Sequence, residues 1–201
     1  MVSTNIPGRV YKLGSGGKCL AHASNMDLDT DTIHQVVYSL TDYRCNGTTS
    51  TVVNSSMRLF DGSFTNGFKI EANFDNMTDS GTGDYRRIFS CESNTSPYPG
   101  LNLTRKKGNN DTAILSLSNT NRVETEFQLL PEHNTVSVKY FAKSGEVVLV
   151  ANGITIRDTV TPLPEFAAYF TIGGQMWVGG TTIAGDRCAA VKINSLKVYK
   201  F

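Results

Sequence analysis

The tightest constraint on the fold lies in the last third of the chain, where short alternating segments are separated by turn residues. Val136 to Tyr140 alternate apolar and polar side chains, and Val147 to Ala151 form an apolar run rich in β-branched residues. Asn152-Gly153 follows directly, and Asn-Gly is among the strongest hairpin signals because both central positions of a type I′ turn need positive φ. We therefore expect an antiparallel meander, with Ile154 and Ile156 facing the core.

The end of the chain carries a second strand signal. Val191, Ile193, Leu196 and Val198 are spaced to fill buried positions, and lysines lie between and after them. Lysines on such a strand suit a solvent face or a sheet edge, where they discourage pairing with another chain. We expect a last strand that runs to Tyr199.

Composition extends this interpretation to the whole chain. Only 18% of the 201 residues are charged and 18 are glycines, a profile typical of many short strands joined by polar turns. No window forms a convincing amphipathic helix, and the length suits one sizeable β domain. Residues 1–35 show no sustained periodicity, whereas strands come at regular spacing from Val36 onward. We predict an all-β fold, with an irregular N-terminal arm or docking segment over residues 1–35 and the domain over residues 36–201.

The charge distribution argues against two classes of partner. The formal net charge is +1, whereas proteins dedicated to nucleic acids or anionic membranes gather basic patches. The only basic run, Arg105-Lys106-Lys107, is followed by Gly108, and we interpret it as a solvated hairpin loop. No apolar stretch is long enough to span a bilayer, and no signal peptide opens the chain. We expect neither nucleic-acid binding nor membrane insertion.

Signals for metal binding are weak. The chain has no Cys-x-x-Cys pair, which speaks against zinc and thioredoxin chemistry. The four cysteines could form two disulfides or stay free thiols, and the spacing does not decide between these alternatives. An acidic run has the alternate spacing that begins an EF-hand loop, but it lacks the later glycine and glutamate, so a solvated loop is favoured over a calcium site. The residues concerned are Cys19, Cys45, Cys91 and Cys188 for the thiols, and Asp27, Asp29 and Asp31 for calcium.

Several short motifs follow one another along the chain: Leu59-Phe60-Asp61, Arg87-Ile88-Phe89-Ser90, Val150-Ala151-Asn152-Gly153, Phe170-Thr171-Ile172-Gly173-Gly174 and the last strand. Their order and spacing resemble the concanavalin A-like lectin/glucanase jelly rolls of the laminin-G and pentraxin type, including modules of phage virion and bacterial surface proteins. Cys45 stands where an aromatic residue is usual, and Thr49 takes the place of the usual Asp-Tyr. The resemblance covers about Tyr38 to Phe201. It implies two antiparallel sheets packed face to face with roughly aligned strands.

One strand separates an enzyme from a binding module. The segment from 68 to 75 alternates strictly and resembles, at a distance, the catalytic strand of laminarinase-type β-glucanases, which place Glu, Asp and Glu at alternate positions. Such retaining enzymes need two carboxyl groups about 5 to 5.5 Å apart. Here Glu71, Asn73 and Asp75 occupy those positions, so the catalytic pattern is broken and we predict no enzyme activity. One register places Phe68, Ile70, Ala72 and Phe74 in the core and Lys69, Glu71, Asn73 and Asp75 in solvent.

Glycan recognition requires an aromatic ring that stacks on a sugar and nearby polar groups that bond its hydroxyls. Trp177 lies between two pairs of glycines and Tyr98 between two prolines, so both are candidates for display on loops. The polar row adds Lys69, Glu71 and Asn73. Two plainer interpretations stand beside this one: Trp177 as a core residue and Tyr98 as an ordinary loop aromatic.

Three function classes follow from the resemblance. The first is a non-catalytic recognition module that binds carbohydrate or another cell-surface ligand, on a phage virion or in an extracellular setting, with a role in host attachment. The second is a virion decoration protein that makes only protein contacts, with residues 1–35 docking to other virion proteins. The third and least favoured is a β-glucan hydrolase. Closed symmetry is the default for homo-oligomers, although nothing in the sequence tests it, and fold alone does not decide among the three classes.

Overall fold

A computed structural model describes residues 3–6, 9–12, 35–46, 52–54, 57–77, 85–93, 98–106, 109–166, 168–173 and 188–201. The chain divides into two compact units, Met1–Gln35 with Phe201 and Val36–Lys200. In the first unit, β1 (Ser3–Ile6) pairs antiparallel with β2 (Arg9–Lys12). Neither strand is predicted from the sequence, because strands of four residues are too short to show a sustained alternation.

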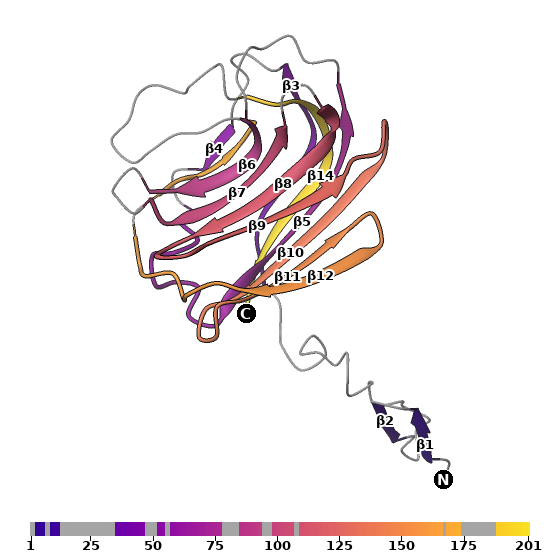
Figure 1. Ribbon diagram of the computed structural model, residues 1–201, viewed down its shortest axis with the longest axis vertical. Helices are drawn as coiled ribbons and strands as arrows, with labels where there is room; N and C mark the ends of the chain where they lie inside the picture. The colour runs from indigo at the N-terminus through magenta and orange to yellow at the C-terminus, as the bar shows by residue number, and fades with distance from the viewer. Residues whose placement is uncertain are drawn as a thin grey trace. The chain divides into compact units, whose positions relative to one another are not determined.

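The second unit is a sandwich of two six-stranded antiparallel sheets. The strand axes of the two sheets are roughly aligned (Figure 1). What we call the first sheet has the order β12-β11-β10-β5-β14-β3, and the second sheet has the order β4-β13-β6-β7-β8-β9. The described residues contain no helix, and the prediction of an all-β jelly-roll sandwich is confirmed.

The strands of the first sheet are β3 (Gln35–Asn46), β5 (Gly67–Asn76), β10 (Asn134–Phe141), β11 (Glu146–Ala151), β12 (Ile154–Thr159) and β14 (Ala190–Lys200). Those of the second sheet are β4 (Val52–Asn54), β6 (Tyr85–Glu92), β7 (Gly100–Lys106), β8 (Asn109–Ser118), β9 (Arg122–Gln128) and β13 (Phe170–Ile172). The first and last strands of this unit, β3 and β14, are neighbours in the first sheet.

The core lies between the sheets, and strict alternation on the strands fills it. The predicted register of β5 is confirmed, because the side chains at its even-numbered positions from 68 to 74 are at most 2% exposed. The second sheet contributes Leu101 and Leu103 from β7 and Leu115 and Leu117 from β8. Burial of this many large apolar side chains is the main stabilising term of such a domain.

The Asn-Gly hairpin forms as predicted. Asn152 and Gly153 have φ values of 49° and 86°, and they join β11 to β12. Ile156 is half-buried against the core, as predicted. Ile154 is 63% exposed, so the prediction that it packs in the core is wrong. It lies on β12, the edge strand of the first sheet, opposite the buried Ala151 of β11, and so points to the same face as Ala151. The alternation is therefore kept, while the edge position leaves Ile154 in solvent.

The last strand also forms as predicted, and a bulge explains its irregular spacing. β14 pairs with β5, and the register shifts between Ile193 and Ser195. The one extra residue at the bulge delays the next inward-facing position by one residue, from 195 to Leu196. As a result Ile193, Leu196 and Val198 are all fully buried.

Two sequence-based expectations about polar and sulfur side chains have clear outcomes. The interpretation of Arg105 as part of a solvated loop is wrong, because Arg105 lies within β7 and is 3% exposed. Cys45, Cys91 and Cys188 are buried thiols that form no disulfide with one another, and burial raises the pKa values of the Cys45 and Cys91 thiols to about 12. Cys19 lies outside the described residues.

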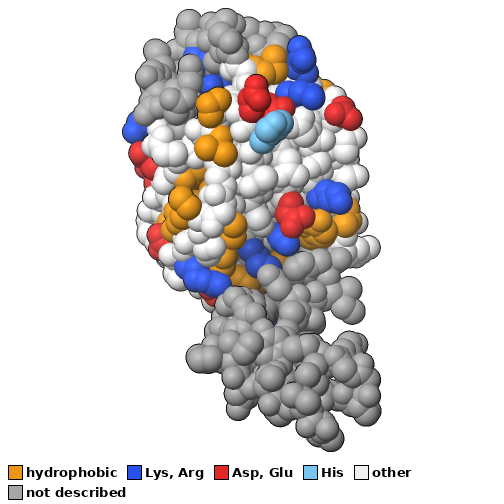
Figure 2. Space-filling model, turned by 90° about the vertical axis from the view of Figure 1, so that its right-hand side faces the viewer, with side chains coloured by type: hydrophobic (Ala, Val, Ile, Leu, Met, Phe, Trp, Pro, Cys, Tyr) orange, Lys and Arg blue, Asp and Glu red, His pale blue; other side chains and the backbone are white. Residues whose placement is uncertain are grey.

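The described surface is mixed in charge. Figure 2 shows one face, on which acidic and basic side chains are interspersed and gather into no broad patch of one sign among the residues it colours. Within the described parts of the chain, no helix has the length and hydrophobicity to cross a membrane.

Candidate functional site

The outward face of the second sheet carries a group of polar side chains that we call the β6–β7 polar cluster: Arg87, Ser90, Glu92, Asn102 and Thr171. Pairing of the strands explains their position. Because the leucines of β7 point into the core, the alternate residue Asn102 points outward. It lies opposite Ser90 on β6, which in turn lies opposite Thr171 on β13.

Hydrogen bonds tie the cluster together. The Glu92 carboxylate accepts from Arg87 Nε at 3.3 Å and from Arg87 Nη2 at 3.3 and 3.4 Å. It also accepts from Asn102 Nδ2 at 2.7 Å. The hydroxyls of Ser90 and Thr171 lie 2.8 Å apart and share a hydrogen bond. Charge-assisted bonds of this kind hold the polar groups in fixed positions.

The cluster is deeply enclosed although it faces away from the core. Ser90, Asn102 and Thr171 are at most 5% exposed, and the side chains of Arg87 and Glu92 are 12% exposed. The Asn102 amide oxygen has no hydrogen-bond partner among the described residues. An amide oxygen in such a setting is suited to accept a hydrogen bond from a ligand hydroxyl.

Tyr98 lies in the connection between β6 and β7, near one end of the cluster. It is 60% exposed and has a φ of 60°. Its carbonyl accepts from Ser118 Oγ at 2.9 Å, and Ser93 N donates to the Pro99 carbonyl at 2.9 Å. Two residues further on, Gly100 lies opposite Glu92. The exposed ring of Tyr98 thus lies two residues before Gly100, the residue of β7 that pairs with Glu92 of the cluster.

Gly100 sets the close approach of β6 and β7 at this point. A Cβ at Gly100 would lie 2.5 Å from the Cys91 carbonyl oxygen and 2.6 Å from Glu92 Cα. Contacts to backbone atoms at such distances require the strands to move apart. Glycine is therefore needed here for Glu92 to keep its place opposite the start of β7.

The predicted site residues Lys69, Glu71 and Asn73 lie on the outward face of the first sheet. Lys69 Nζ is 2.7 Å from the Glu71 carboxylate, which also accepts from Tyr199 Oη at 2.7 Å. Asn73 donates to Ser195 Oγ at 2.9 Å. These polar groups are thus engaged with one another and with β14, and their role in ligand binding stays a prediction.

Ionisation of the Glu71–Tyr199 pair is coupled. Burial opposes the charge on Glu71, but hydrogen bonds from Lys69 and Tyr199 and the nearby lysine charges outweigh it and lower its pKa. The hydrogen bond to the Glu71 carboxylate raises the pKa of Tyr199 to about 12. We expect Glu71→Gln to lower the Tyr199 pKa towards 10, because the phenol then no longer faces a negative charge. NMR titration of the Tyr199 ring checks this, with Asn73→Ala as the control; an unchanged Tyr199 pKa in Glu71→Gln would contradict the coupling.

Asp75, four residues after Glu71 on β5, accepts a hydrogen bond from the His133 backbone N–H at 2.8 Å. Between the two carboxylates stands the amide Asn73, at the position where the glucanase pattern has its central carboxylate.

Other predicted site residues fall outside the part of the chain that the structure describes. Trp177 and the calcium candidates Asp27, Asp29 and Asp31 are among them. Within the described ranges, no three His, Cys, Asp or Glu side chains group together as metal ligands.

No protein family model matches the sequence, and no curated protein matches it. Solved structures of similar fold include the Ruminococcus gnavus IT-sialidase CBM40 bound to alpha2,3 sialyllactose, with a TM-score of 0.62 and 17% identity over 82% of this chain and 92% of that one. The same module bound to alpha2,6 sialyllactose matches with a TM-score of 0.60 and 16% identity, over 82% of this chain and 93% of that one.

A K499G mutant of the NanB sialidase from Streptococcus pneumoniae matches with a TM-score of 0.62 and 14% identity, over 81% of this chain. This chain spans only 26% of that protein. At these identities the likeness shows the fold alone. The chain has the concanavalin A-like jelly-roll sandwich that the sequence motifs predicted.

Proposed function

We propose that this chain is a non-catalytic carbohydrate-binding module, whose glycan site consists of the β6–β7 polar cluster and Tyr98. The observation that carries the proposal is the combination of an exposed ring at one end of a fixed network of carboxylate, guanidinium and amide groups. Sugars are bound by such a combination, since a ring covers the apolar face and polar groups bond the hydroxyls. The sialyllactose complexes of the similar CBM40 module support sialylated glycans as the first ligands to test.

Binding of α2,3- and α2,6-sialyllactose, with lactose for comparison, tests the proposal by calorimetry and on a glycan array. We expect Tyr98→Ala to weaken binding about tenfold, because stacking and hydrogen bonds of this kind are worth about 1 to 1.5 kcal/mol. The side chain of Tyr98 is exposed, so its removal leaves the core intact. Asn102→Ala removes the amide oxygen and is expected to act in the same direction.

Asn73→Ala is the matched control, because it removes the same chemical group from the outward face of the other sheet. We expect it to leave glycan affinity unchanged. Loss of affinity in Asn73→Ala with full affinity in Asn102→Ala would move the site to the first sheet, where the sequence analysis placed it. Absence of binding to every glycan would overturn the proposal.

A second candidate function, protein contact alone, is favoured by apolar side chains on both edge strands of the first sheet. Val36 and Val37 on β3 are 50% and 37% exposed, and Ile154 on β12 is 63% exposed. Exposed apolar residues at sheet edges are suited to contacts with other chains. A virion setting and a docking role for residues 1–35 belong to this proposal; the resemblance of the segment from 59 to 65 to phage surface modules supports them.

A further inference from the structure

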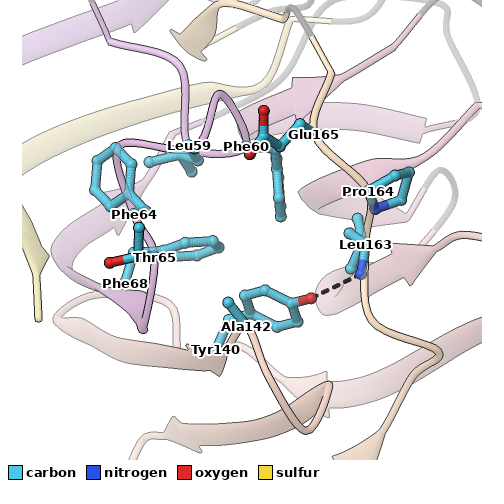
Figure 3. Close-up of a pocket in the computed structure, with 11 residues that line it drawn as sticks. Leu59, Phe60, Phe64, Thr65, Phe68, Tyr140, Ala142, Leu163, Pro164 and Glu165 are labelled. Carbon is cyan, nitrogen blue, oxygen red and sulfur yellow. Dashed lines mark hydrogen bonds between the residues drawn. The ribbon is translucent and has the colours of Figure 1, made fainter.

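A pocket of about 250 Å³ is lined by residues that lie outside the β6–β7 polar cluster (Figure 3). Three segments enclose it: residues 59–68, the end of β10 with its following turn, and residues 163–165. Phe68 and Tyr140 are at most 2% exposed, whereas Thr65, Pro164 and Glu165 are exposed. The pocket therefore has an apolar interior and an accessible rim.

Aromatic packing makes the walls rigid. The Phe60 ring meets Phe68 and Tyr140 edge to face, with centroids 5.5 and 5.8 Å apart. Phe166 stacks on Phe60 at 4.6 Å and supports it from one side. The Tyr140 hydroxyl accepts from the Leu163 backbone N–H at 2.8 Å, which fastens the 160–166 segment across the pocket (Figure 3). A cavity held by such contacts is preformed rather than opened by the ligand.

Glu165 places a negative charge at the rim. No described residue donates a hydrogen bond to its carboxylate or forms an ion pair with it. The carboxylate lies against Gly62, since a Cβ built there would be 2.7 Å from Glu165 Oε1. The absence of a side chain at Gly62 thus leaves room for the carboxylate at the rim of the aromatic-lined pocket. A carboxylate at this place favours a positively charged group on a bound ligand.

We propose that this pocket binds a small apolar group that carries one positive charge, such as an arylalkylammonium. The volume suits a single ring, since an apolar cavity of about 150 Å³ already admits benzene. A sugar fits poorly, because Thr65 and Glu165 are the only polar side chains among the lining residues other than the engaged Tyr140. The binding site is independent of the glycan site.

Benzylammonium at neutral pH is the probe, with benzyl alcohol and benzoate as uncharged and anionic counterparts of the same ring. We expect calorimetry or NMR to show the order benzylammonium, benzyl alcohol, benzoate in decreasing affinity. Glu165→Gln keeps the shape of the side chain and removes its charge. It is expected to weaken benzylammonium binding about fivefold and to leave benzyl alcohol binding unchanged, as for a partly exposed ion pair.

Two further variants locate the site. Ala142→Leu fills the pocket and is expected to abolish binding of both ligands, whereas Tyr98→Ala is expected to change neither. Glu132→Gln removes an exposed charge elsewhere and serves as the matched control. Equal affinity of the wild-type protein for the amine and the alcohol, an unchanged amine affinity in Glu165→Gln, or no binding of any probe would overturn the proposal. None of these results bears on glycan binding, which the Tyr98→Ala comparison measures separately.

Discussion

Replacement of Gly145 by alanine is expected to lower the free energy of unfolding by about 3 kcal/mol, one of the two largest effects predicted for this domain. A Cβ at this position would lie 1.9 Å from the Val160 carbonyl oxygen, and the backbone φ is +72°. Gly145 N donates to the Phe141 carbonyl at 2.8 Å, and Val160 N donates to the Gly145 carbonyl at 3.0 Å. Overpacking costs about 1 to 3 kcal/mol and the left-handed backbone about 1 to 2 kcal/mol more, and these hydrogen bonds prevent easy relief.

Gly153→Ala separates the two contributions. Gly153 also has a positive φ, +86°, but no atom lies within 4 Å of the position that its Cβ would take. The expected loss there is about 1 kcal/mol, from the backbone conformation alone. Urea unfolding measures both variants, with the denaturant midpoint falling further for Gly145→Ala and the slope unchanged. Equal losses would show that the contact with Val160 carries no cost.

The strands that the sequence predicted best are those whose signals are local. On β5 the alternation of Phe68, Ile70 and Phe74 with polar residues fixes the buried face without knowledge of the partner strands. The turn at Asn152-Gly153 likewise depends on two adjacent residues. Whether a side chain is covered at a sheet edge depends on the opposite sheet, and for that reason the exposure of Ile154 was beyond the sequence.

The candidate site was harder to predict because non-local pairing assembles it. Tyr98 was visible as a loop aromatic, but the β6–β7 polar cluster joins residues whose proximity follows only from register. Ser90 and Thr171 are 81 positions apart, and they meet because β13 lies beside β6. The register between Arg87 and Phe89 also shifts, so simple alternation along β6 assigns the wrong face to part of the strand.

Arg105 shows how a local charge pattern misleads. In the sequence it begins a run of three basic residues before a glycine, which is typical of a solvated turn. In the structure its Nη1 donates to the carbonyls of Met77 and Ala190, at 3.0 and 2.9 Å. These acceptors lie just after β5 and at the start of β14, so Arg105 links the second sheet to the first. Lys106, paired with the exposed Glu126, is solvated as the pattern indicates, and Lys107 lies outside the described residues.

Arg105→Met is expected to lower the free energy of unfolding by about 3 kcal/mol. Methionine keeps an apolar stem of similar length but donates no hydrogen bond, and buried bonds from a charged donor are worth about 1.5 to 3 kcal/mol each. Part of this loss is offset because the Ala190 carbonyl still accepts from Met77 N at 3.1 Å. Lys106→Met is the matched control, and its expected cost is below about 1 kcal/mol because its ion pair with Glu126 is exposed. If urea unfolding showed equal losses for the two variants, Arg105 would be the solvated residue that the sequence suggested, and the two sheets would be held together without it.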